Sequence, residues 1–256
     1  MTQRWRLGID VGASATKAVL LDGEAVAARA LRKSGADFAG AAEACRDEIG
    51  RVAGLDVRVV ERVVATGYGR RSVEFAGQVV TEITCHARGC HASFPQAITI
   101  VDIGGQDNKV IALEADGVRR GFKMNRKCAA GTGAFLEEIA GRLDTPLSEL
   151  NDLARKAEGE TELGSFCTVF AKTELLRLIA QGMPLAEMAM AAFRSVTKRI
   201  MEMDPLEGQV VMTGGVVAHN PIIVELVSKA LGREVLVPDQ PQYTGALGAA
   251  LLARER

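Results

Sequence analysis

The chain alternates between short runs of aliphatic, mostly β-branched residues and longer segments whose apolar residues recur every three to four positions. The first pattern predicts buried strands and the second predicts amphipathic helices. Segments 5–32 and 97–125 each have the pattern of three short strands joined by tight, glycine-containing turns. Further strands are predicted at 57–67, 209–215 and 233–239. Helices are predicted at 37–54, around 70–75, from about 84, over most of 133–203, and at 220–232 and 242–256.

The two three-strand segments resemble each other. Each begins with a β-branched strand that ends in I-D-V-G (9–12) or V-D-I-G (101–104) and continues through a turn into an aliphatic strand. Internal repetition of this kind predicts two similar α/β lobes, which we expect to pack around a cleft. We expect residues 1–95 to form the first lobe and residues 96–242 the second. The C-terminal helix, at about 243–256, is expected to pack back on the first lobe.

Composition narrows the class of protein. The chain has 256 residues, 25% of them charged, and a net charge of -1, so nothing indicates a nucleic acid or a membrane surface as a partner. There is no apolar run of membrane-spanning length and neither end resembles a signal peptide or an anchor, so we expect a cytoplasmic protein. Five cysteines are present, but disulfides are not expected in that compartment.

Two strand ends carry candidate phosphate-binding turns, "IDVGASATK" (9–17) and "VDIGGQDNK" (101–109). The sequence lacks the P-loop and the G-x-G-x-x-G fingerprint. A turn of small residues nevertheless exposes successive backbone N–H groups that can cradle phosphate oxygens, and a strand-end aspartate can hold Mg²⁺ through water. Asp10 and Asp102 are the candidate Mg²⁺ residues. The candidate phosphate-binding residues are Gly12, Ser14, Thr16, Lys17, Gly104, Gly105 and Gln106.

A third glycine pair ends another predicted strand, in "TGGVVAHN" (213–220), and could let a flat base lie against the backbone. In this order the three motifs resemble the actin, Hsp70 and sugar-kinase superfold, in which two ribonuclease-H-like lobes clamp Mg-ATP. The resemblance implies that Asp10 and Asp102 order Mg²⁺ and the attacking water, with Gln106 as a further catalytic candidate. The reaction would be phosphoryl transfer, to water if no acceptor hydroxyl binds. The residues implied to border the nucleoside are Gly214, Gly215 and Asn220.

Two cysteines, Cys128 and Cys167, each precede a predicted helix, whose free N–H groups and partial positive charge would stabilise a thiolate or a bound anion. A cubane iron–sulfur cluster typically requires four thiolates. One chain offers two in this setting, and a two-fold dimer would supply the other two. Either cysteine could instead be a small buried hydrophobe, as we expect for Cys45. Cys85 and Cys90, in "TCHARGCHAS", raise the alternative of a zinc site, although adjacent residues on a helix point apart.

A closer resemblance covers nearly the whole chain. It is carried by "TGYGR", "TEITCHA", "VDIGGQDNKVI", "KCAAGTGAFLE", "CTVFAKTE", "TGGVVAHN" and "GALGAALLA". These segments are similar to the BadF/BcrA-type ATPases, which activate 2-hydroxyacyl-CoA dehydratases or hydrolyse ATP as subunits of benzoyl-CoA reductase. One departure is Arg126, where relatives commonly carry Asp, and this changes the charge next to Cys128.

The family resemblance implies a set of cofactors and partners. Cys128 and Cys167 would hold one [4Fe–4S] cluster between two subunits, either two copies of this chain or this chain and a close paralogue. Ferredoxin or flavodoxin would donate the electron. ATP hydrolysis would drive that electron into a partner enzyme, a reductase or a dehydratase, which carries out the acyl-CoA chemistry itself.

Several functions stay open from the sequence. The form of "CTVFAKTE" and the Arg- and Ala-rich composition favour an ATPase subunit of benzoyl-CoA reductase over a homodimeric dehydratase activator. A small-molecule kinase of the same fold would need a substrate-binding insertion between Leu31 and Val64, where little space is left. A non-enzymatic zinc- or ATP-binding regulator built around "CHARGCH" would bind one zinc per chain and would not turn over ATP.

Overall fold

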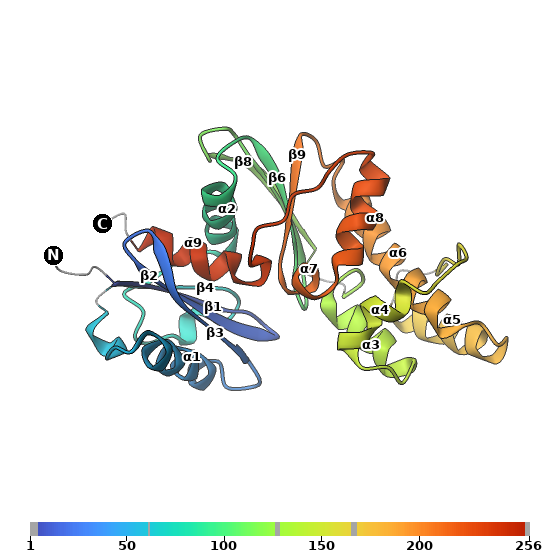
Figure 1. The fold of residues 1–256 in the computed structure, drawn as a ribbon, viewed down its shortest axis with the longest axis horizontal. Helices are drawn as coiled ribbons and strands as arrows, with labels where there is room; N and C mark the ends of the chain where they lie inside the picture. The colour runs from blue at the N-terminus through green and yellow to red at the C-terminus, as the bar shows by residue number, and fades with distance from the viewer. Residues whose placement is uncertain (1–4, 61, 126–128, 165–167, 254–256) are drawn as a thin grey trace. The chain divides into compact units, whose positions relative to one another are not determined.

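The computed structural model describes residues 5–60, 62–125, 129–164 and 168–253 (Figure 1). The chain divides into two compact units. The first contains residues 1–98, 111–120 and 238–256, and the second contains residues 99–110 and 121–237. Three separate stretches of sequence therefore build the first unit, and two build the second.

A five-stranded sheet in the order β3-β2-β1-β4-β5 organises the first unit. Its strands are β1 (Trp5–Val11), β2 (Ala15–Asp22), β3 (Ala25–Lys33), β4 (Arg62–Thr66) and β5 (Gln78–Val79). The first three form an antiparallel meander, and β4 and β5 continue the sheet in parallel beyond β1. Because side chains alternate across a strand, Ile9 and Val11 face one side of the sheet while Gly8 and Asp10 face the other.

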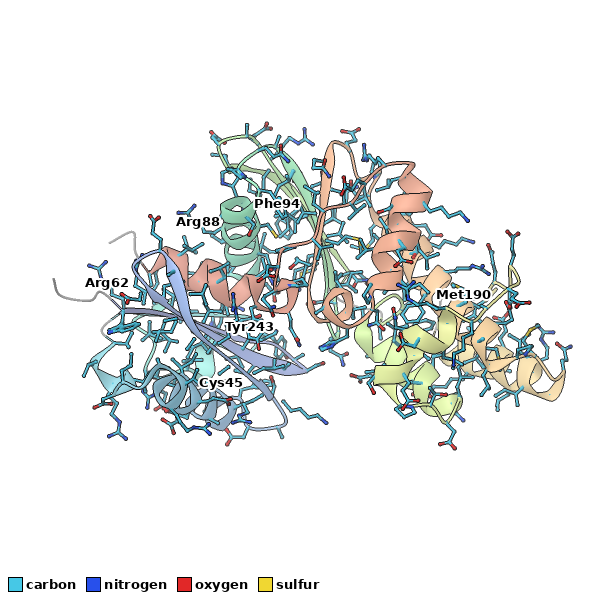
Figure 2. The ribbon with its side chains drawn as sticks, in the orientation of Figure 1. Cys45, Arg62, Arg88, Phe94, Met190 and Tyr243 are labelled. Atoms are coloured by element: carbon cyan, nitrogen blue, oxygen red, sulfur yellow. The ribbon has the colours of Figure 1, made fainter. Side chains whose placement is uncertain are left out.

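Helices cover both faces of this sheet. Helix α1 (Phe38–Ala53) begins where the Asp37 side chain accepts from Gly40 N, and it packs on β1, β2 and β3. Figure 2 shows Cys45 on this helix, and it belongs to the core between α1 and the sheet. Helix α9 (Thr244–Leu252) covers the opposite face, where it contacts β1, β2 and β4, and α2 (Glu82–Ser93) packs against α9. Gly8 permits this packing, because a Cβ there would lie 2.0 Å from Ala246 O.

A second sheet has four strands in the order β8-β7-β6-β9. Its strands are β6 (Ile98–Ile103), β7 (Asn108–Leu113), β8 (Arg119–Asn125) and β9 (Gln209–Thr213). The helices of the second unit are α3 (Gly133–Arg142), α4 (Leu150–Ala154), α5 (Thr168–Ala180), α6 (Leu185–Met203), α7 (Gly215–His219) and α8 (Pro221–Leu231). Their apolar sides form one core, in which Phe135 and Phe193 are fully buried.

Three predicted elements differ from the structure. The strand predicted at 57–67 begins only at Arg62, because Val57–Val59 form a 3-10 turn capped by the Asp56 side chain. The helix predicted around 70–75 is a short 3-10 turn, Arg70–Ser72. The strand predicted at 233–239 is reduced to a single bridge between Val211 and Leu236, and Pro238 cannot extend it because proline has no N–H group. Two more 3-10 turns, Leu147–Glu149 and Pro241–Tyr243, lead into α4 and α9.

No helix in the described ranges combines the length and the apolar character that a membrane span needs.

Candidate functional site

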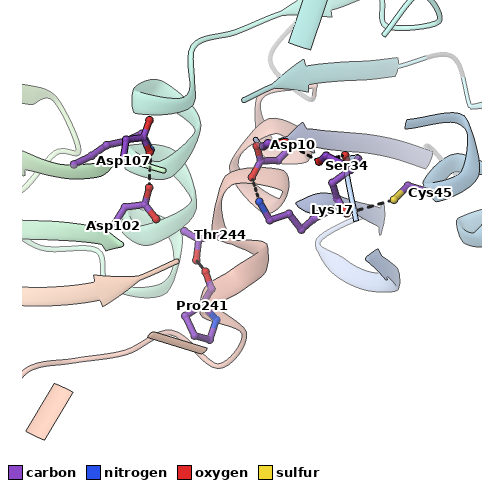
Figure 3. A network of polar contacts seen from close by, with 11 residues as sticks. Asp10, Lys17, Ser34, Cys45, Asp102, Asp107, Pro241 and Thr244 are labelled. Atoms are coloured by element: carbon purple, nitrogen blue, oxygen red, sulfur yellow. Dashed lines mark hydrogen bonds and ion pairs between the residues drawn. The ribbon is translucent and has the colours of Figure 1, made fainter. Parts of the chain in front are cut away.

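Asp10 lies near the carboxyl end of β1, directly across from Lys17 of β2. Lys17 Nζ donates to Asp10 Oδ2 at 3.0 Å, and both side chains are largely buried (Figure 3). The pairing register places the two side chains on the face of the sheet that α9 covers. The lysine therefore fixes the direction of a carboxylate that could hold hydrated Mg²⁺.

Two glycines outside the predicted set make room for Asp10. A Cβ at Gly67 would lie 2.4 Å from Asp10 Oδ1, and a Cβ at Gly245 would lie 3.0 Å from Asp10 Oδ2. Gly67 also has a φ of 88°, which favours glycine. Both glycines belong to "TGYGR" and "GALGAALLA", two of the segments that carry the family resemblance. The sequence therefore marks both glycines through these two segments, but it does not indicate that they contact Asp10.

The turn between β1 and β2 is closed by a hydrogen bond from Gly12 N to Ala15 O at 3.0 Å. Ala13 and Ser14, at its tip, are exposed. In the part of the chain that the structure describes, the backbone N–H groups of these two residues have no acceptor. Such amides are available to bind phosphate oxygens.

The Thr16 side chain does not face the same side of the sheet as that of its neighbour Lys17. Its side chain is fully buried on the opposite face of the sheet, and its hydroxyl is hydrogen-bonded to Ser34 Oγ at 2.9 Å. Ser34 Oγ in turn donates to Gly12 O at 2.6 Å. The structure therefore places the Thr16 hydroxyl behind the turn, where it supports Gly12, and not beside Lys17.

Asp102 repeats the arrangement of Asp10 in the second unit. It lies near the end of β6, and Lys109 Nζ of β7 donates to Asp102 Oδ2 at 3.0 Å. The same ammonium group donates to Asp107 Oδ1 at 2.6 Å. Lys109 is only 3% exposed, so it is a buried cation between two carboxylates. Lys109 was not among the predicted site residues, although Lys follows Asp by seven positions in both motifs.

The turn after β6 has the same closure as the turn after β1. Gly104 N donates to Asp107 O at 2.9 Å. The N–H groups of Gly105 and Gln106 have no acceptor among the described residues, and Gln106 is exposed. This second turn therefore also presents amides that could bind phosphate oxygens.

In the predicted nucleoside motif, the first glycine, Gly214, lies next to Asp102. Gly214 has a φ of 102°, and a Cβ there would lie 2.4 Å from Ile103 O and 2.5 Å from Asp102 Oδ1. Gly215 is the first residue of α7. Asn220 is buried, and its Nδ2 donates to Val216 O at 2.9 Å. The Asn220 side chain is therefore engaged at the junction of α7 and α8.

The candidate cluster ligands Cys128 and Cys167 lie outside the described residues, as does Arg126. Helix α3 starts at Gly133, five positions after Cys128, and α5 starts at the position after Cys167.

The remaining cysteines, Cys45, Cys85 and Cys90, are buried thiols. Burial raises the pKa of Cys45 to about 11 and that of Cys85 to about 12. Among the residues with described positions, no three or more His, Cys, Asp or Glu side chains form a group that could hold a metal ion. The "CHARGCH" segment therefore does not assemble the zinc site that the regulator hypothesis requires.

Each unit thus supplies an aspartate held by a lysine, next to a turn whose tip carries N–H groups without acceptors among the described residues. Carboxylates and backbone amides are the groups that hydrated Mg²⁺ and phosphate require. Gly214 adds a glycine at which the backbone packs directly against Asp102 and Ile103. The residues present fit a Mg-nucleotide, and they suit phosphoryl transfer by positioning and electrostatics.

Sequence comparisons identify relatives over the whole chain. Residues 7–253 match the BadF/BadG/BcrA/BcrD ATPase family. The chain is 42% identical to the activator of lactoyl-CoA dehydratase from Anaerotignum propionicum, covering 98% of both chains. It is 38% identical to the 2-hydroxyisocaproyl-CoA dehydratase activator of Clostridioides difficile, covering 97% of this chain and 94% of the relative. It is 30% identical to one of the benzoyl-CoA reductase subunits of Thauera aromatica, covering 95% and 91%.

Comparison with solved structures identifies the same kind of relative as the sequence comparison does. The activator of the 2-hydroxyisocaproyl-CoA dehydratase from Clostridium difficile, solved with bound ADPNP, has a TM-score of 0.92 at 37% identity, covering 97% of this chain and 94% of that one. The ethanolamine utilization protein EutJ from Carboxydothermus hydrogenoformans shares the fold alone, with a TM-score of 0.67 at 18% identity over 98% and 91% of the two chains. The predicted α/β fold of the actin, Hsp70 and sugar-kinase type is therefore confirmed. Taken with the full-length match, these similarities show that the chain belongs to the BadF/BadG/BcrA/BcrD ATPase family.

Proposed function

We propose that this chain is the ATP-hydrolysing activator of a 2-hydroxyacyl-CoA dehydratase. The observation that carries the proposal is full-length identity of 38% and 42% to relatives named as activators of 2-hydroxyisocaproyl-CoA and lactoyl-CoA dehydratases. The two Asp–Lys pairs and the two turns support it, because they supply groups that an ATPase needs around its nucleotide.

The alternative is an ATPase subunit of benzoyl-CoA reductase, which the sequence alone favoured. The reductase subunit from Thauera aromatica is 30% identical to this chain, against 42% for the lactoyl-CoA dehydratase activator. The Arg- and Ala-rich composition carries less weight than this difference, because it can follow from a GC-rich genome. The activator is therefore the better supported function.

In the proposed reaction, the backbone N–H groups of the two turns bind the phosphate oxygens of ATP. Lys17 holds Asp10 and Lys109 holds Asp102, so that the two carboxylates orient hydrated Mg²⁺ and the attacking water. Water attacks the terminal phosphorus, the bond to the bridging oxygen breaks, and ADP and phosphate leave. Gln106 is a further candidate for orienting the water, and Gly214 and Gly215 are candidates to border the nucleoside.

Cys128 and Cys167 are the proposed ligands of a [4Fe–4S] cluster shared with a second copy of the chain or a close paralogue. Thiolates close to helix starts are suitable donors for it. When bound, the cluster would supply a low-potential electron. Ferredoxin or flavodoxin would be the electron source, and the dehydratase catalytic subunits in the cytoplasm would receive the electron.

The experiment is anaerobic purification followed by iron and sulfide assays and an activation assay. We expect about two irons per chain, as for one cubane shared by two subunits, and ATP-dependent activation of a 2-hydroxyacyl-CoA dehydratase. Cys128→Ser and Cys167→Ser should each lose the iron, while Cys45→Ala, at a buried position in the first unit, should keep it.

Other outcomes would support the other functions. Stimulation of benzoyl-CoA reductase without dehydratase activation would favour the reductase subunit. An iron-free protein that phosphorylates a metabolite would favour the kinase, and a zinc-loaded protein without ATP turnover would favour the regulator.

A further inference from the structure

The second phosphate turn is hydrogen-bonded to the helix that follows Cys128. Gly133 N donates to Gly104 O at 2.9 Å, and Ala134 N donates to Gly105 O at 2.8 Å. Gly133 and Ala134 are the first two residues of α3, and the first N–H groups of a helix have no acceptor within the helix. The two turn carbonyls supply those acceptors, so α3 starts on the turn itself.

The same peptide groups of the turn also present N–H groups on the side away from α3. In a trans peptide the C=O of one residue and the N–H of the next point in opposite directions. Because the carbonyls of Gly104 and Gly105 point at α3, the N–H groups of Gly105 and Gln106 point away from it. A phosphate bound to those two N–H groups would act on the same peptide planes that hold the start of α3.

Asn108 forms a second link between the turn and this part of the chain. It is 1% exposed, and its Nδ2 donates to Gly131 O at 2.8 Å. Gly131 has a φ of 82° and precedes Thr132, whose hydroxyl donates to Ala129 O at 2.7 Å. Neighbouring residues of a strand face opposite sides, so Lys109 holds Asp102 on one face of β7 while Asn108 holds Gly131 on the other.

The repeat within the sequence shows that this use of Asn108 is particular to the second unit. Thr16 occupies the equivalent position of the first motif, one residue before the lysine. It is bonded to Ser34, just after β3. The same position therefore supports the turn in the first unit, and in the second unit it connects the turn to residues 129–132.

We propose that the two turn peptides and Asn108 transmit the presence of a terminal phosphate from the second turn to residues 129–134, which join Cys128 to the first turn of α3. Asn108 is a positioning residue in this arrangement, since it acts through Gly131. The inference rests on the proposed nucleotide function. ATP and ADP differ in the terminal phosphate, so these residues should be held differently in the two complexes.

The test measures amide hydrogen exchange in residues 129–136 of the anaerobically purified protein, with Mg-ADP and with a non-hydrolysable Mg-ATP analogue. In the wild type we expect slower exchange with the analogue than with ADP. Asn108→Leu has a side chain of similar size without a donor, and it should reduce this nucleotide-dependent difference about fivefold, the factor that the loss of one hydrogen bond gives. Binding of the analogue, measured in parallel, should be retained.

Thr99→Val is the matched control. It removes another buried side-chain donor on the same sheet, the bond from Thr99 Oγ1 to Glu207 O at 2.7 Å, and should leave the full difference between nucleotides. Asn108→Ala is the second variant if Asn108→Leu does not fold.

Two results would overturn the inference. One is an unchanged difference in the folded Asn108 variant, and the other is a wild type that binds both nucleotides without any difference in exchange. A wild type that binds neither nucleotide would overturn the proposed function instead, so the two failures are distinguishable.

Discussion

Lys109 Nζ lies 3.0 Å from Asp102 Oδ2, and each of these side chains is only 4% exposed. Lys17 and Asp10 are at the same separation in the first unit, with 14% and 7% of their side chains exposed. A buried ion pair adds little net stability, but removing one partner leaves the other charge buried and uncompensated. The two pairs therefore look alike in geometry and should differ in their response to mutation.

Lys109→Met should lower the free energy of unfolding by about 3–5 kcal/mol, because it leaves the Asp102 carboxylate buried without its cation. Lys17→Met should cost less, because water reaches that pair more easily. Urea denaturation of both variants without nucleotide measures the difference. Equal losses would contradict the argument from burial.

Asp102→Asn should slow ATP hydrolysis about 10²-fold or more, because the amide keeps the shape of the side chain but cannot hold hydrated Mg²⁺ or the attacking water as a carboxylate does. Nucleotide binding should persist. Phosphate release and calorimetric titration separate the two effects. The control is Asp204→Asn, at the end of α6, which should hydrolyse ATP as the wild type does. If Asp102→Asn hydrolysed ATP at the wild-type rate, the result would contradict a catalytic role for Asp102.

Gly214→Ala should destabilise the protein by about 1–3 kcal/mol, because its φ of 102° strains any side-chain-bearing residue. The new Cβ would also approach Asp102 Oδ1 to 2.5 Å, so ATP hydrolysis should fall as well. Gly141→Ala, in α3, meets nothing within 4 Å and should stabilise the helix by about 0.5–1 kcal/mol. Thermal unfolding and phosphate release test the pair. Normal activity in a folded Gly214→Ala protein would contradict the close contact with Asp102.

Glu187 should make the loop that leads to Cys167 sensitive to acid. Its carboxylate accepts from Gly159 N at 2.6 Å and from Glu158 N at 2.8 Å, and these hydrogen bonds lower its pKa from 4.5. A lowered pKa in the folded state contributes stability above the unfolded value, and this contribution is lost as pH falls through the folded value. Amide exchange in residues 158–164, measured relative to the intrinsic rate at each pH, should therefore rise below pH 4.5.

Glu187→Gln should raise that exchange at neutral pH and remove its dependence on acid, because the amide does not titrate. Glu202→Gln, at an exposed position on the same helix, should behave as the wild type. A wild-type loop whose exchange stays flat through the acid range would refute the role of Glu187.

Many of the strands and helices could be predicted from local patterns in the sequence. The strands β1, β2, β6 and β7 follow from runs of aliphatic residues next to glycine turns, and α1 follows from an Ala-rich segment between Asp37 and Gly54. The strand predicted at 57–67 was too long because the Asp56 side chain caps a 3-10 turn, and this hydrogen bond outweighs the β-branched composition of 57–60.

By itself, the sequence determined the order of the elements, the turns after Asp10 and Asp102, and the family, because these depend on neighbouring residues and on motifs. Only the tertiary structure decided that Lys109 is buried between two carboxylates, that Thr16 lies behind its turn, and that Gly245 makes room for Asp10. It alone decided that α3 starts on the turn carbonyls. The physical reason is that strand register and the packing of distant segments set these contacts, and neither is encoded in any single stretch of the chain.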